Sequence, residues 1–190
     1  MNTSILRLAC TGLSALVLAV SAAAAPAEII IIRHAEKPTD GPTLDARGYE
    51  RANALVRLFE SDPRVLTFGK PAAIFSARPS KAGGSVRSIE TMVPTAKALG
   101  IMSDTRFSKE DIPALVRAVL TNPAFDGKTV LVCWEHKKIP DIVRAFGWTS
   151  AALSWDDAVF DRLWILDFDE AKPARFRDLP QRLLDGDSTS

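Results

Sequence analysis

The two histidines of this 190-residue chain lie at or near the ends of apolar runs. His34 follows Arg33 and the four isoleucines 29–32, and His136 comes shortly after the run Thr129–Trp134. A neutral imidazole can attack phosphorus, and a guanidinium can hold phosphate oxygens through paired N–H donors. The pair Arg33 and His34 therefore indicates chemistry on a phosphate group, and His136 is suited to donate to phosphoryl oxygens at the same site.

The apolar runs predict the elements that position these histidines. Consecutive β-branched residues are typical of strands buried on both faces, as in the interior of an α/β sheet. Ligand crevices of open α/β sheets lie at the carboxyl ends of their strands, which is where both histidines are expected. We predict βα units on a largely parallel sheet, with strands over 28–32, 72–76, 130–134 and 163–168 and helices over 46–60, 88–99, 111–120 and 139–146. Pro94 is expected to kink or divide its helix, and the polar residues 185–190 are expected to fray.

Four motifs in order resemble the signatures of the histidine phosphatase superfamily, which contains cofactor-dependent phosphoglycerate mutases and many acid phosphatases. The matching segments are Arg33-His34-Ala35, residues 44–52, Ser76 with residues 87–91, and residues 130–136. The resemblance implies a three-layer α/β/α fold with a mostly parallel central sheet. It also implies a phosphohistidine formed on His34, phosphate contacts from Arg33, Arg87 and His136, and no metal or other cofactor.

Two further basic residues are candidates for phosphate binding. Ten residues separate Ser76 from Arg87, a longer interval than in the family, and Arg78 lies within it as a rival for the same role. Arg87 is favoured because it follows a glycine-rich loop at the expected start of a helix, where anions bind well. Lys37 lies three residues after His34 and can also reach a phosphate.

The proton donor has no recognisable motif in this chain. Glu135 adjoins His136 and is the preferred candidate, with Glu36 and Asp111 as alternatives. Neighbouring residues on an extended strand point to opposite faces, so Glu135 can share a pocket with His136 only if the backbone turns directly after Trp134.

The first 24 residues have the composition of a signal peptide. Arg7 is their only charge, an apolar stretch covers residues 8–20, and small residues precede the expected cleavage after Ala24. The domain is therefore expected over 25–190, in a periplasmic or secreted protein with no stable membrane association after cleavage. The remaining basic and acidic residues balance at 23 each, which gives no reason to expect nucleic acid as a partner. Cys133 is the one cysteine left, so an internal disulfide is excluded.

We interpret the sequence as an exported phosphatase that hydrolyses phosphomonoesters of small molecules through a phosphohistidine. Two alternatives remain. A phosphomutase shares the first half of this chemistry, and a non-catalytic phosphate- or phosphoester-binding module would keep the phosphate contacts without the proton donor. The sequence does not indicate the oligomeric state.

Overall fold

The computed structural model describes residues 25–150 and 153–189. The predicted signal peptide lies outside the described residues. Within the described ranges, no helix has the length and hydropathy needed to cross a membrane.

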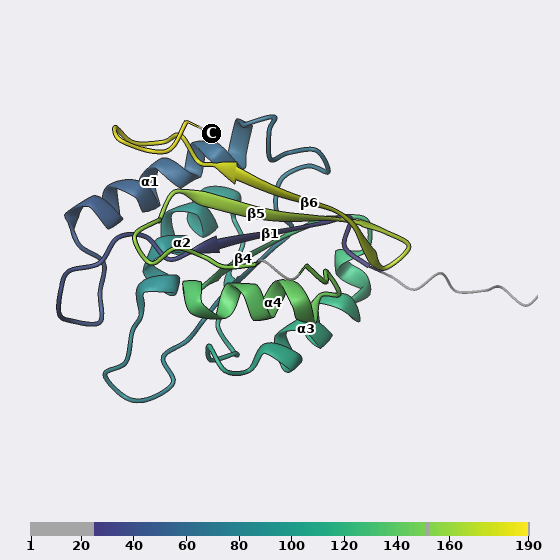
Figure 1. Ribbon diagram of the computed structural model, residues 1–190, viewed down its shortest axis with the longest axis horizontal. Helices are drawn as coiled ribbons and strands as arrows, with labels where there is room; N and C mark the ends of the chain where they lie inside the picture. The colour runs from purple at the N-terminus through teal and green to yellow at the C-terminus, as the bar shows by residue number, and fades with distance from the viewer. Residues whose placement is uncertain (1–24, 151–152, 190) are drawn as a thin grey trace, which may run out of the picture.

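A six-stranded mixed sheet, with the strand order β3-β2-β4-β1-β5-β6, forms the centre of the molecule (Figure 1). β3, β2, β4 and β1 run parallel to one another, whereas β5 is antiparallel to β1, and β6 is antiparallel to β5. The strand bounds are β1 Glu28–Arg33, β2 Ala73–Ser76, β3 Ser103–Asp104, β4 Thr129–Trp134, β5 Arg162–Asp169 and β6 Lys172–Pro180. The α/β class and the mostly parallel sheet are thus confirmed.

The central strand β1 is buried along its whole length and contributes to two cores. Ile29 and Ile31 pack with one core, and Ile30 and Ile32 with the other, because successive side chains of a strand point to opposite faces. Two helices cover each face of the sheet (Figure 1). On the first face lie α3 Ile112–Leu120 and α4 Ile139–Ala145, and on the second lie α1 Ala46–Ser61 and α2 Arg87–Leu99. Three layers therefore bury the isoleucine run on both sides.

Three details differ from the sequence-based expectation. Two strands were not predicted. β3 has only two residues. Lys172–Pro180 of β6 is rich in charged residues and prolines, and most of its side chains are partly or fully exposed at the sheet edge. α2 continues on both sides of Pro94, so the helix is not divided there. The C-terminal segment does not fray as a whole, because Asp187 accepts hydrogen bonds from Arg51 at 2.7 and 3.0 Å.

The pairing of β1 with β4 brings the two histidines to one edge of the sheet. The strands are parallel and in register, with Arg33 opposite Trp134. The backbone N–H of His34 then donates to the carbonyl oxygen of Trp134 at 3.1 Å. Both strands end at this point, so the residues that follow each strand face the same crevice.

Candidate active site

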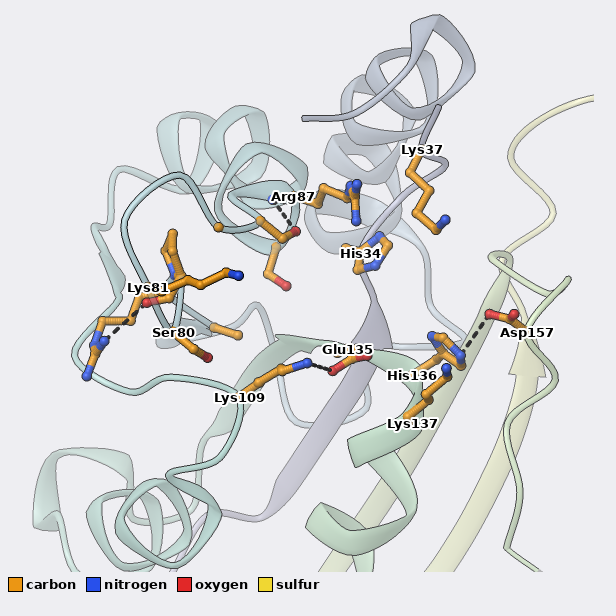
Figure 2. Close-up of a pocket in the computed structure, with 16 residues that line it drawn as sticks. His34, Lys37, Ser80, Lys81, Arg87, Lys109, Glu135, His136, Lys137 and Asp157 are labelled. Carbon is orange, nitrogen blue, oxygen red and sulfur yellow. Dashed lines mark hydrogen bonds and ion pairs between the residues drawn. The ribbon is translucent and has the colours of Figure 1, made fainter. Parts of the chain in front are cut away.

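A cavity of about 380 Å³ lies at this edge of the sheet (Figure 2). Five segments line it: the turn after β1, the stretch from Ala77 to Ser88, Lys109 in the loop before α3, the turn after β4, and the loop between α4 and β5. Its charged lining residues are Lys37, Arg78, Lys81, Arg87, Lys109 and Lys137 on the basic side, and Glu135 and Asp157 on the acidic side. The cavity is large enough for a small molecule and has an excess of positive charge.

His34 lines this cavity and is held as a neutral imidazole. Its side chain is buried, and Nδ1 lies 2.8 Å from the carbonyl oxygen of Ala35. A carbonyl can only accept, so Nδ1 carries the proton and Nε2 carries the lone pair. Burial lowers the pKa of His34 to about 4, and the positive charges of Arg33 and Arg87 act in the same direction. The ring is therefore in the protonation state that a nucleophile at phosphorus requires.

The turn after His34 is fixed by contacts from two helices. The backbone N–H of Ala35 donates to Oγ1 of Thr91 in α2 at 2.9 Å. A Cβ at Gly48 of α1 would lie 2.2 Å from the carbonyl oxygen of Glu36, so only glycine allows this close approach. Helix packing thereby determines where the His34 ring lies.

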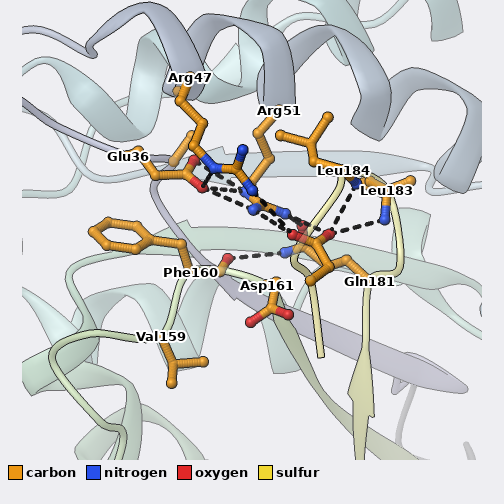
Figure 3. A network of polar contacts seen from close by, with 12 residues as sticks. Glu36, Arg47, Arg51, Val159, Phe160, Asp161, Gln181, Leu183 and Leu184 are labelled. Atoms are coloured by element: carbon orange, nitrogen blue, oxygen red, sulfur yellow. Dashed lines mark hydrogen bonds and ion pairs between the residues drawn. The ribbon is translucent and has the colours of Figure 1, made fainter. Parts of the chain in front are cut away.

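Glu36 belongs to a different group of residues from the one that lines the cavity. Its carboxylate accepts from Nε of the buried Arg51 at 3.0 Å and from Nη2 at 2.7 Å, and Arg51 also holds Gln181 and Asp187 (Figure 3). The pairing with Arg51 holds the Glu36 carboxylate outside the cavity that His34 lines. This ion-pair cluster ties the C-terminal segment to α1, and Glu36 is not placed to donate a proton in the cavity.

The backbone turns directly after Trp134, as the sequence analysis required for Glu135 to share the cavity. Residues His136–Lys138 form a 3₁₀ turn, and Glu135, His136 and Lys137 all line the cavity. Glu135 lies 2.9 Å from Nζ of Lys109. Burial raises the pKa of Glu135, but the ammonium group of Lys109 outweighs burial, so that this pKa is lowered overall.

His136 is 6 % exposed, and both of its ring nitrogens are covered. Nε2 lies 2.9 Å from Oδ1 of Asp157, but neither ring nitrogen makes a hydrogen bond of good geometry within the described chain. Burial lowers the pKa of His136, as does the neighbouring charge of Arg33, while Asp157 and Glu135 oppose them. A second neutral imidazole therefore lies across the cavity from His34.

Arg33 does not line the cavity. Its guanidinium is fully buried, and Nη1 donates to the carbonyl oxygens of Asp157 at 2.6 Å and Val159 at 3.0 Å. The ring of Phe160 stacks on it, with Cζ of Arg33 3.6 Å from the ring centroid. Burial lowers the pKa of Arg33 to about 10, which still leaves it charged at neutral pH. In this arrangement Arg33 holds the loop before β5 through backbone carbonyls. Its one contact with a carboxylate is that of Nη2, which lies 3.5 Å from Oδ1 of Asp157.

Both arginines proposed from the sequence as alternatives line the cavity, but their positions differ. Arg87 begins α2 and lies beside His34, with Nε and Nη2 bound to the carbonyl oxygens of Thr43 and Gly41 (Figure 2). Arg78 donates to the carbonyl oxygens of Arg106 and Pro79. The charge of Arg87 contributes to the lowered pKa of His34, in keeping with its place beside the predicted nucleophile.

Lys37 and Asp157 line the cavity, and Asp111 does not. Lys37 lines the cavity beside His34 (Figure 2). Asp111 does not line it, since its carboxylate accepts from the backbone N–H and the hydroxyl of Ser108. Asp157 does line it and was missed, because nothing in the spacing of Trp155-Asp156-Asp157 points to a site over a hundred residues earlier in the chain. Within the described residues, no group of three or more His, Cys, Asp or Glu side chains is arranged to hold a metal ion.

Comparison with known proteins assigns the fold. No protein family profile and no curated protein matches the sequence. Among solved structures, the chain is similar to the protein histidine phosphatase SixA complexed with tungstate, at 12 % identity and a TM-score of 0.57, covering 81 % of this chain and 97 % of that one. It is also similar to phosphoglycerate mutase from Bacillus anthracis, at 12 % identity and a TM-score of 0.55, covering 84 % and 94 %. A putative alpha-ribazole-5'-P phosphatase from Escherichia coli matches at 13 % identity and a TM-score of 0.53, covering 84 % and 98 %.

These similarities show the fold. The chain has a phosphoglycerate mutase-like α/β fold, which it shares with the histidine phosphatase and phosphoglycerate mutase structures named above. The fold expected from the four sequence motifs is therefore confirmed.

Proposed function

We propose that this protein is an exported phosphatase that hydrolyses phosphomonoesters of small molecules through a phosphohistidine on His34. The observation that carries the proposal is the state of His34. Its Nδ1 proton is bound to the carbonyl oxygen of Ala35, and burial keeps the ring neutral in a cavity lined by cations. The lone pair on Nε2 is then available for attack on phosphorus.

The charge of the cavity supports an anionic substrate. Six lysines and arginines line it against two carboxylates. Lys37, Lys81 and Lys137 come from three different segments, and none has an ion-pair partner elsewhere in the described chain. A phosphate dianion would replace this mutual repulsion with attraction, and Arg87 and His136 would stabilise the charge of the equatorial oxygens during transfer.

The solved structures with the same fold agree with this class of reaction. Two of them are described as phosphatases and one as a phosphoglycerate mutase. Export is supported by the apolar residues 8–20 and the small residues before position 25. Because phosphorylated sugar intermediates are cytosolic, export favours a phosphatase over a phosphomutase.

The proposal is tested with p-nitrophenyl phosphate and the His34→Ala variant of the purified protein. The parent is expected to release p-nitrophenol and to carry acid-labile phosphate after rapid quenching, whereas the variant does neither. His136→Ala serves as the comparison, because it keeps the nucleophile and is expected to slow turnover without abolishing the phosphoenzyme. Comparable activity in His34→Ala would refute the mechanism. Binding of phosphate without turnover by the parent would instead identify a non-catalytic binding module.

A further inference from the structure

The carboxylate of Asp157 contacts two of the residues that the sequence assigned to phosphate binding, His136 and Arg33. Its Oδ1 lies 2.9 Å from Nε2 of His136 (Figure 2). The same oxygen lies 3.5 Å from Nη2 of Arg33. Building on the proposed phosphatase activity, we propose that Asp157 is the proton donor to the leaving oxygen. It leaves His136 and Arg33 when the phosphate arrives.

The other carboxylates are less suited to this task. Glu135 and Asp157 are the two acidic residues that line the cavity over the described chain. Glu135 is bound to the ammonium group of Lys109 at 2.9 Å, which favours its ionised form. Glu36 is committed to Arg51, and Asp111 to Ser108. Within the described residues, the ion-pair contacts of the Asp157 carboxylate are those with His136 and Arg33, and none is with a lysine.

Phosphate and the Asp157 carboxylate compete for the same donors. Both ring nitrogens of His136 are covered in the structure, and the carboxylate of Asp157 lies against Nε2. His136 can bind a phosphoryl oxygen through Nε2 only after the carboxylate has moved. The side chain of Asp157 is 76 % exposed, so it can rotate without breaking a packed core. Beside a phosphate dianion, like-charge repulsion then favours uptake of a proton by the displaced carboxylate.

The backbone of Asp157 remains in place while the side chain moves. Nη1 of Arg33 binds the carbonyl oxygens of Asp157 and Val159, and the guanidinium stacks on Phe160. These contacts do not involve the carboxylate. The protonated side chain is therefore held next to the bound phosphoryl group, where the leaving oxygen must be.

The proposed steps balance in atoms and electrons. Nε2 of His34 forms a bond to phosphorus as the bond from phosphorus to the leaving oxygen breaks, and the carboxyl proton of Asp157 passes to that oxygen. The alcohol departs and leaves Asp157 as a carboxylate. A water molecule then gives a proton to Asp157 and attacks phosphorus. The N–P bond breaks with its electron pair returning to His34, and inorganic phosphate is released.

The test compares Asp157→Asn with the matched control Asp156→Asn on two substrates. Asp156 is the preceding residue, is also exposed, and accepts a backbone hydrogen bond from Ala158 that an asparagine can retain. A proton donor matters for an alkyl leaving group and little for p-nitrophenolate. For Asp157→Asn we expect kcat/KM to fall about 100-fold on glycerol 2-phosphate and less than about fivefold on p-nitrophenyl phosphate. Asp156→Asn is expected to match the parent on both.

A second readout separates proton donation from positioning. Inorganic phosphate should inhibit Asp157→Asn at least as strongly as the parent, because the competing negative charge is gone. An equal loss on both substrates with weaker phosphate inhibition would mean that Asp157 only positions His136, and the inference would be wrong. It would also be wrong if Glu135→Gln, rather than Asp157→Asn, selectively lost glycerol 2-phosphate hydrolysis. In each of these results p-nitrophenyl phosphate hydrolysis still depends on His34, so the proposed function survives. If hydrolysis does not depend on His34, both proposals fail.

Discussion

The protonation of His34 makes the stability of this protein depend on pH in a way that one substitution can isolate. Burial lowers the pKa of His34 from 6.5 to about 4 in the folded protein. Between these values the unfolded chain binds a proton that the folded chain does not. Acidification through this range therefore favours unfolding, and the stabilisation is fully present only above the unfolded pKa.

The expected magnitude follows from the two pKa values. A difference of about 2.5 pKa units corresponds to roughly 3 kcal/mol, of which about 2 kcal/mol is lost between pH 7 and pH 4.5. His34→Asn removes the titrating group, and its side-chain amide can still donate to the carbonyl oxygen of Ala35. The free energy of unfolding of this variant should therefore fall by about 2 kcal/mol less than that of the parent over the same pH interval.

Urea unfolding at pH 7 and pH 4.5 measures this difference. Carboxylates with lowered pKa values, such as Asp62 and Asp187, also lose stabilising charge in acid. They are the same in both proteins and cancel in the comparison. With only two histidines in the chain, nuclear magnetic resonance can follow the His34 ring directly, and it should remain neutral at pH 5. Equal pH dependence in parent and variant, or a His34 ring that titrates near 6.5, would refute the reasoning.

Two further predictions concern the arginines. Arg87→Ala should lower kcat/KM on p-nitrophenyl phosphate by an amount equivalent to about 2 kcal/mol or more, because Arg87 lies beside His34. Arg78→Ala should lower kcat/KM much less. The reverse order would assign the phosphate contact to Arg78. Arg51→Met should lower the free energy of unfolding by about 3 kcal/mol, because it leaves the carboxylate of Glu36 without its buried partner, whereas Arg57→Met on the exposed face of the same helix should have little effect in urea unfolding.

Arg33 was predicted to contact phosphate, but its side chain does not line the cavity. The prediction rested on its position before His34 at the end of a strand. Alternation along the strand instead buries its guanidinium, where it binds the carbonyl oxygens of Asp157 and Val159. The residue still serves the site through the loop that carries Asp157.

The sequence by itself determined the elements that depend on local pattern. The isoleucine run buries its side chains on both faces only as an interior strand of a sheet, and the apolar run Thr129–Trp134 pairs with it. Two residues at the carboxyl ends of parallel neighbours must lie together, so the approach of His34 to His136 followed from the sequence. The helix predicted over 46–60 forms as α1, and its apolar residues Leu55, Leu58 and Phe59 pack in one core.

Only the tertiary structure decided which polar side chains enter the cavity. Glu36 and Glu135 are both within two residues of a histidine, yet one pairs with Arg51 and the other lines the cavity beside Lys109. Asp157 arrives from a loop 123 residues after His34, and its position depends on the backbone carbonyls that Arg33 binds. The apolar pattern of each strand or helix can be predicted locally, because it depends on which of that element's own side chains are buried. Charged side chains pair with residues from distant segments, and only the folded chain brings those segments within reach of each other.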